Sequence, residues 1–163
     1  MEIKKVLFPV DLAGSSYRIV SQVRSIVDQV DAELHLLFVV GTLERYHTFY
    51  VPHPSLDIME KEGLKHAQRQ LEDFAEKYFE DRPKVKTVVL RGSPVEQIRK
   101  YIESVGIDMV VVASVDRHGL DRAIFGDIAE EIIRTSPVPV TTVNPFAAET
   151  AQVQGQGEIR AMA

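Results

Sequence analysis

The sequence predicts an α/β fold: a single open, doubly wound sheet of five parallel strands with helices on both faces. The first observation is that short apolar runs alternate, along most of the chain, with longer segments whose apolar residues recur every three or four positions. The second is that the short runs are apolar at consecutive positions, which is typical of parallel strands buried on both faces. Right-handed crossovers between such strands favour the doubly wound order.

Each element is predicted from its own local pattern. Strands are expected at residues 6–10, 34–40, 85–90, 109–113 and 138–143. Helices are expected after Ser15-Ser16, which can cap the first of them, over about 56–80, from Ser93-Pro94 and from Gly126-Asp127. Their apolar faces are expected to include Val23, Val27 and Val30 in the first, Leu71 and Phe74 in the second, Ile98 and Ile102 in the third, and Ile128, Ile132 and Ile133 in the last.

Composition excludes several classes of protein. The chain has 163 residues, 45% hydrophobic and 26% charged, which is typical of one globular domain. A net charge of -5 offers no basic surface for nucleic acid. The absence of cysteine excludes a disulfide scaffold, a thiolate nucleophile and a cysteine-ligated metal. No segment approaches the ~18 apolar residues of a membrane span and no signal peptide is recognisable, so we expect no membrane partner and a cytoplasmic protein.

One domain is predicted over residues 3–145, followed by a C-terminal extension over 146–163. The extension is rich in Ala, Gln and Gly and lacks periodicity, so we expect it to be mobile or loosely docked, with an added edge hairpin as the alternative. The irregular segment 41–55 carries His47 and His53 among aromatic residues. Its role stays open between a lid, a contact with a partner chain, a metal-binding pair and plain exposure.

The predicted fold places a candidate ligand site at one edge of the sheet, because ligands of open parallel sheets bind beyond the carboxyl ends of the strands. The segments expected to meet there contain Pro9, Val10 and Asp11, then Val39, then Ala113 and Asp116, and finally Gly126, Asp127 and Ile128 at the start of the last helix. Asp11 is placed to accept a hydrogen bond from a ribose hydroxyl. It is equally placed to cap the turn into the first helix.

Four stretches of the sequence, in this order and spacing, resemble the motifs of the universal stress protein family. They are Phe8-Pro9-Val10-Asp11, Arg91-Gly92-Ser93-Pro94, residues 107–112, and Ser136-Pro137-Val138-Pro139-Val140 after Gly126. The resemblance covers about residues 3–145. It implies a role in stress response, a homodimer and, for one branch of the family, ATP binding.

The ATP-binding branch carries a loop written G-x2-G-x9-G-[ST]. If its third glycine is placed on Gly126, the other three positions fall on Ala113, Asp116 and Asp127, which depart from the pattern. Glycine in such a loop lets the backbone approach phosphate, whereas two aspartates add negative charge there. Two like charges at ~4 Å repel by about 1 kcal/mol in water and about 4 at an effective dielectric of 20. We therefore expect weak or no ATP binding and no cofactor, with ATP or AMP and Mg²⁺ as the alternative.

The closing strand is predicted to lie at an edge of the sheet, where a β-branched strand invites pairing with another chain. In the resembled family this strand forms a homodimer across a two-fold axis, which implies an interface at Val138, Val140, Thr141, Thr142 and Val143. No nucleophile elbow, P-loop or zinc motif occurs, so no catalytic residue and no metal site is predicted. The expected protein is a non-catalytic homodimeric stress-response or regulatory module with protein partners still to be found. The alternative is an ATP- or AMP-binding switch with little or slow hydrolysis.

Overall fold

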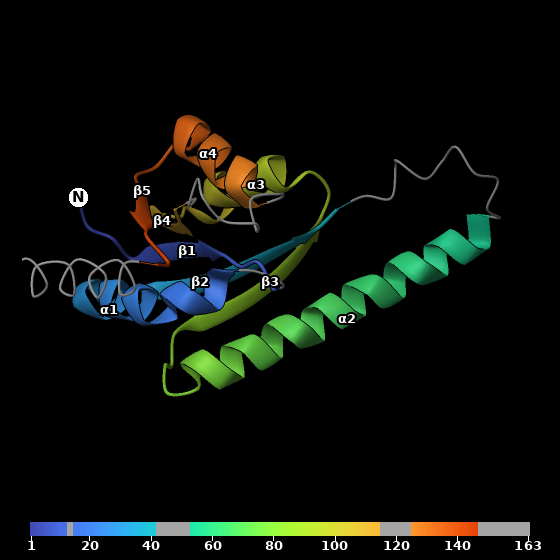
Figure 1. Ribbon diagram of the computed structural model, residues 1–163, viewed down its shortest axis with the longest axis horizontal. Coiled ribbons are helices and arrows are strands. Elements are labelled where there is room, and N and C mark those ends of the chain that lie inside the picture. Colours follow the sequence, from blue (N-terminus) through green and yellow to red (C-terminus); the bar gives the residue numbers. More distant parts are fainter. Residues whose placement is uncertain (13–14, 42–52, 115–124, 147–163) are drawn as a thin grey trace, which may run out of the picture.

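The computed structural model describes residues 1–12, 15–41, 53–114 and 125–146. Within these residues, strands and helices alternate along the chain (Figure 1). In order they are β1 (Lys5–Pro9), a short 3₁₀ helix η1 (Ser15–Ile19), α1 (Val20–Val30), β2 (Glu33–Val40), α2 (His53–Phe79), β3 (Val85–Arg91), α3 (Pro94–Val105), β4 (Met109–Ala113), α4 (Phe125–Thr135) and β5 (Val140–Val143).

The five strands form one sheet in the order β3-β2-β1-β4-β5, and every neighbouring pair is parallel. The chain therefore builds outward from β1 to β3, returns to the other side of β1, and continues to β5. This is the doubly wound α/β fold that the alternating pattern predicts. The order reverses between β2 and β4, on either side of β1, and open sheets bind their ligands at such a reversal.

Helices cover both faces of the sheet, with α1 and α2 on one side and α3 and α4 on the other (Figure 1). Successive residues of a strand point to opposite faces, so β1 contributes to both layers. Phe8 packs with Val23 of α1 and Leu71 of α2 in one buried cluster. Leu7 packs with Ile98 of α3 in the other. Each layer buries apolar side chains, and together they account for the consecutive apolar residues of the strands.

The first helix begins differently from the prediction. Residues Ser15–Ile19 form a 3₁₀ helix, the α-helix begins at Val20, and its capping position, Ile19, makes no side-chain capping bond. Ser16 is buried, and its Oγ accepts the backbone N–H of Asp11 at 2.7 Å. The Ser16 hydroxyl therefore closes the turn after β1 instead of capping the α-helix.

Two residues of the predicted apolar faces are exposed. Ile133 is 48% exposed while its neighbour Ile132 is buried, because adjacent residues of a helix lie about 100° apart and only one of them can face the sheet. Val30 is 37% exposed at the last turn of α1, where the chain turns through the left-handed Asp31. The helical period of 3.6 residues decides which side chains face the sheet, even where consecutive residues are apolar.

Helix α2 is longer than the strands of the sheet, and its N-terminal part extends beyond the sheet (Figure 1). Its 27 residues span about 40 Å at 1.5 Å per residue, against about 25 Å for a strand of seven or eight residues. The C-terminal part carries the buried Ala67, Leu71 and Phe79, whereas Ile58 and Met59 near the N-terminus are exposed. None of the helices in the described part of the chain is long and apolar enough to cross a membrane.

Candidate functional site

The carboxyl ends of β1, β2 and β4 meet at one edge of the sheet, as predicted. Pro9 ends β1 opposite Leu37 of β2, and the next residue, Val10, donates its N–H to the Leu37 carbonyl at 2.8 Å. Val39 lies one residue before the end of β2, and Ala113 ends β4. Asp116 lies outside the described residues.

The side chains at this edge are divided between the two faces of the sheet. Val10 and Ala113 pack into the layer under α1 and α2. Val39 and Ile128 pack into the layer under α3 and α4. The predicted residues therefore do not line one side-chain cavity. A ligand at the edge would lie across the ends of the strands, between Asp11 on one side and the start of α4 on the other.

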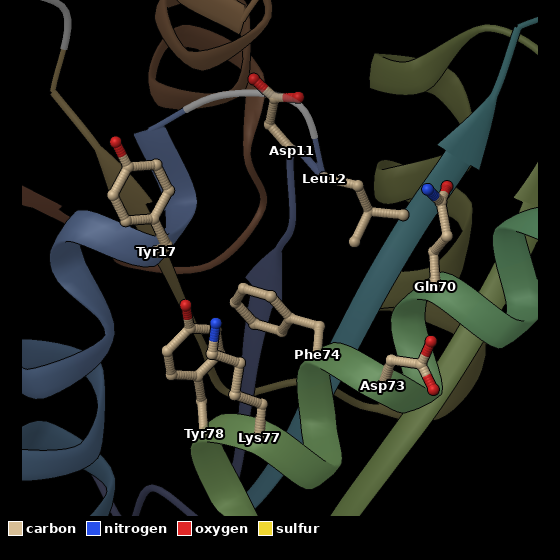
Figure 2. Close-up of a pocket in the computed structure, with 8 residues that line it drawn as sticks. All are labelled: Asp11, Leu12, Tyr17, Gln70, Asp73, Phe74, Lys77 and Tyr78. Atoms are coloured by element: carbon tan, nitrogen blue, oxygen red, sulfur yellow. The ribbon is translucent and has the colours of Figure 1, made fainter.

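The loop after β1 holds Asp11 through its backbone. The Asp11 N–H donates to Ser16, and the carboxylate lies at the rim of a pocket, pointing away from the aromatic side chains below it (Figure 2). The turn into the first helix is thus closed by the hydroxyl of Ser16, which was predicted to cap the helix itself. The Asp11 carboxylate lies beyond the carboxyl end of β1, as the sequence predicts.

The pocket beside Asp11 was not predicted. It has a volume of about 330 Å³ and lies between the loop after β1, η1 and α2 (Figure 2). Its lining comprises Asp11, Leu12, Tyr17, Gln70, Asp73, Phe74, Lys77 and Tyr78. The helical period identified Phe74 as part of an apolar face, but it gave no sign that the 3₁₀ helix η1 would leave this side chain partly uncovered.

Aromatic and charged groups are combined in this pocket. The rings of Phe74 and Tyr78 lie 4.8 Å apart between centroids, and the Lys77 ammonium lies 5.1 Å from the centre of the Tyr78 ring. Phe74 and Tyr78 also pack against the buried cluster under α1 and α2. The pocket therefore combines apolar rings with the charged groups of Asp11, Asp73 and Lys77.

The start of α4 differs from the expected capping arrangement. The helix begins at Phe125, so Gly126 is its second residue and Asp127 its third. Asp127 therefore lies inside the helix, whereas the sequence predicted that the helix would open at Gly126-Asp127. Within the first turn its negative charge still interacts favourably with the helix dipole. It lies where a bound phosphate would otherwise take up that attraction.

Strand β5 lies at the edge of the sheet, as predicted, and the hydrogen bonds to β4 define which of its backbone groups are turned outward. Val110 donates its N–H to the Pro139 carbonyl at 3.0 Å, and Ser114 donates to the Val143 carbonyl at 2.7 Å. Because backbone direction alternates along a strand, Thr141 also faces β4, while the N–H and C=O groups of Val140 and Thr142 face away from the sheet.

Val138 lies outside the strand. Its N–H donates to Ser136 Oγ at 3.2 Å and its carbonyl accepts from the same hydroxyl at 2.8 Å, so a turn around Pro137 uses both groups. Pro139, without an N–H, faces β4 rather than the open edge. The strand therefore begins at Val140 instead of Val138, and Pro139 leaves the outer edge intact.

Comparison with known proteins gives the same fold and family. The model of the universal stress protein family matches residues 2–144. The universal stress protein MJ0531 of Methanocaldococcus jannaschii is 25% identical over 147 residues, covering 86% of this chain and 81% of the relative. The solved structure of MJ0577 from the same organism is 23% identical, with a TM-score of 0.72 and coverage of 88% of this chain and 97% of that one.

A third similar protein is a universal stress protein solved in complex with cAMP. It is 16% identical to this chain, with a TM-score of 0.64 over 89% of this chain and 99% of the other. At this identity the likeness concerns the fold. Since the family model spans nearly all of the described residues, this chain belongs to the universal stress protein family.

Proposed function

We propose that this protein is a non-catalytic, homodimeric stress-response module of the cytoplasm that pairs with a second copy through β5 and binds ATP weakly or not at all. The observation that carries the proposal is the open edge of β5. Val140 and Thr142 present their backbone groups away from the sheet, and no other strand among the described residues pairs with that side. An unpaired edge of this kind is a template for another strand.

The charge at the start of α4 supports weak ATP binding. Asp127 stands in the first turn, and Asp116 precedes the helix in the sequence, so a triphosphate would approach two carboxylates. The helix dipole is already matched by the protein's own anion. Because the chain carries a net charge of -5, we expect the regulatory partners to be proteins rather than nucleic acids.

A second candidate function is a switch that binds AMP or a related nucleoside monophosphate. Asp11 and the aromatic pocket beside it favour this candidate, because they suit a ribose and a heteroaromatic base without requiring a site for three phosphates. The similar universal stress protein solved with cAMP supports the same class of ligand.

Two measurements on the purified protein test these proposals. Sedimentation velocity should give the mass of a dimer, and a monomer at high micromolar concentration would refute pairing through β5. Calorimetric titration with ATP, ADP and AMP in the presence of Mg²⁺, after chromatography of any co-purified nucleotide, should show no tight ATP binding. Co-purified ATP would refute the charge argument, and AMP binding without ATP binding would establish the second candidate.

A further inference from the structure

A large apolar side chain is exposed on α4. Ile133 is 48% exposed, whereas Ala129 and Ile132 of the same helix are buried in the layer under α3 and α4. Among the described residues of α3 and α4, Ile133 is the one large apolar residue with such exposure. Single apolar residues at a surface are ordinary, so the significance of Ile133 depends on what lies beside it.

Ile133 lies on the flank of α4 that faces β5. Helix α3 packs beside α4 on the same face of the sheet (Figure 1). Residues of an α-helix follow one another by about 100° in a right-handed sense, so Ile133 lies that far round from Ile132, which faces the sheet. In a right-handed crossover from β4 through α4 to β5, this rotation leads away from α3 and toward β5. Ile133 is therefore beside the open edge that the proposed dimer uses.

The backbone edge of β5 is too small to hold a dimer by itself. Its four residues extend over about 13 Å, and the side of a sheet layer about 10 Å thick then offers on the order of 130 Å² to a partner. A stable interface buries about 800 Å² on each partner. A dimer that pairs through β5 must therefore also bury side chains next to the strand, on one or both faces of the sheet.

Two-fold symmetry brings the α4 helices of two copies to the same face. Identical edges that pair reciprocally run antiparallel, and the two-fold axis then stands perpendicular to the sheet. An axis at Thr141 lets Val140 of each copy exchange hydrogen bonds with Thr142 of the other, which uses every outward backbone group of β5. Because Ile133 lies on the β5 side of α4, the two Ile133 side chains are then directed toward each other across the paired strands.

The side chains around Ile133 suit a second copy of the chain. Val140 packs under α3 and α4, so its side chain and that of Thr142, two residues on, lie on the same face of the sheet as Ile133. Helix α4 has an acidic residue, Asp127, in its first turn and a basic residue, Arg134, in its last. The two-fold axis sets the two helices antiparallel, so the acidic end of each lies toward the basic end of the other. The arrangement is therefore complementary to itself in charge.

We propose that the dimer interface extends from β5 onto α4, where a second copy of this chain buries Ile133. This inference rests on the proposed pairing through β5, and it adds the side chain that completes the interface. In the monomer almost half of the Ile133 surface meets water. In the dimer that surface is removed from water, which stabilises the association.

The first test is Ile133→Glu, measured by sedimentation velocity over a dilution series of the full chain. The dissociation constant of the dimer should rise at least about tenfold, because the variant loses apolar burial and places two carboxylates near the axis. The circular dichroism of the monomer should stay unchanged, since the side chain is exposed and glutamate favours helix. Ile58→Glu is the matched control, because it makes the same change at an exposed isoleucine of α2, on the opposite face of the sheet. It should leave the constant within about twofold.

The outcomes separate this inference from the proposed function. A monomeric unmodified chain would overturn both. A dimer whose dissociation constant is the same for Ile133→Glu and Ile58→Glu would overturn the role of Ile133 and leave the pairing through β5 in place. Selective weakening by Ile133→Glu supports the extended interface.

A thiol gives a second test if Ile133→Glu does not fold. The chain has no cysteine, so Ile133→Cys introduces a single reactive thiol. With a maleimide in excess, this thiol should react several times more slowly at protein concentrations above the dissociation constant than below it, whereas the thiol of Ile58→Cys should react at one rate. A rate for Ile133→Cys that does not depend on protein concentration would contradict the burial of this residue.

Discussion

Two polar residues are buried within the described part of the chain, and the hydrogen bonds of each hold one part of the structure in place. Ser16 accepts the N–H of Asp11 and so holds the loop on which the candidate ligand site depends. His35 joins a strand to a helix through Glu33 and Tyr101. Buried polar groups without partners cost free energy, so both residues mark places where the backbone or a helix is held in one position.

Gly92 is a residue at which even the small change to alanine should destabilise the fold. Its φ is +138°, and a Cβ built on it would lie 2.7 Å from Gln97 Nε2 and 3.2 Å from Gln97 Cγ. Gly92→Ala should therefore lower the free energy of unfolding by about 1–3 kcal/mol. Urea unfolding measures the change.

Gly63 supplies the control for this substitution. It lies within α2, and nothing stands within 4 Å of the Cβ that alanine would add. Gly63→Ala should leave stability unchanged or raise it by up to about 1 kcal/mol, because alanine favours helix. Equal effects of the two substitutions would contradict the strain assigned to Gly92.

At the scale of elements, the proposed dimer depends on β5 and the proposed weak ATP binding depends on α4. β5 has four residues, and its outward backbone groups belong to Val140 and Thr142. Short edge strands protect a protein from indiscriminate pairing while they still permit a specific contact. α4 begins at Phe125 and carries its own acidic residue in the first turn. In the proposed function, β5 pairs with a second copy of the chain, and the acidic residue of α4 weakens polyphosphate binding.

Thr142→Pro tests the edge directly. The substitution removes an N–H that faces outward and leaves the bonds to β4, so the monomer should fold while the dimer is weakened. Two equivalent bonds are lost across a two-fold axis, which corresponds to about 1–3 kcal/mol, or roughly ten- to hundredfold in the dissociation constant. Analytical ultracentrifugation measures the constant. Thr142→Ala keeps the N–H, and a comparable weakening in that variant would mean that the backbone edge is not the interface.

The start of α4 can be tested by restoring the glycine pattern of the ATP-binding branch. The triple variant Ala113→Gly, Asp116→Gly, Asp127→Ser removes two negative charges and the methyl group of Ala113 at the proposed phosphate position. ATP affinity should rise by tenfold or more, since each pair of like charges costs about 1–4 kcal/mol. Calorimetry is the measurement, with Ala113→Gly alone as the control for backbone freedom. No gain in the triple variant would refute the charge argument.

At the scale of the whole molecule, the two ends of the sheet have different chemistry. The carboxyl edge carries Asp11 and the start of α4, with a pocket beside it. The amino edge carries a bonded polar network, in which Asp108 accepts the N–H groups of Lys4 and Lys5 at 2.8 and 2.9 Å. The pocket lies beside the carboxyl edge, and the hydrogen bonds at the amino edge stabilise the fold.

Acid stability should depend on the amino edge. Bonds from Lys86, in the first place, and from His35 hold the pKa of Glu33 below its ordinary value of 4.5. Its contribution is complete above that value and is lost as the pH falls through the lower pKa of the folded state. Glu33→Gln should therefore flatten the loss of stability below about pH 4.5, by an amount on the order of 1 kcal/mol or less.

Chemical unfolding over a series of acidic pH values measures this dependence. Glu103→Gln is the matched control, since it changes an exposed carboxylate of α3 outside the network. An acid dependence in Glu33→Gln that is as steep as in the unmodified protein would contradict the role given to Glu33.

Much of the architecture was predictable because each local pattern agrees with the fold. The strand at Met109–Ala113 was predicted with its observed bounds, and the long helix was predicted to within a few residues. The site was less predictable. Val138 was assigned to the strand on its β-branched side chain, but its backbone is used by Ser136. Such competition between a turn and a strand is decided by hydrogen bonds that propensity does not describe.

By itself the sequence determined the α/β class, the parallel sheet with its closing strand at the edge, and the universal stress protein family, because these depend on periodicity and motif order along the chain. The tertiary structure decided which groups meet. It brought Lys77 and Tyr78 of α2 beside Asp11, joined His35 to Tyr101, and turned Val140 and Thr142 outward. Contacts between residues distant in the chain depend on register and on the reach of each side chain, and neither is encoded in a local pattern.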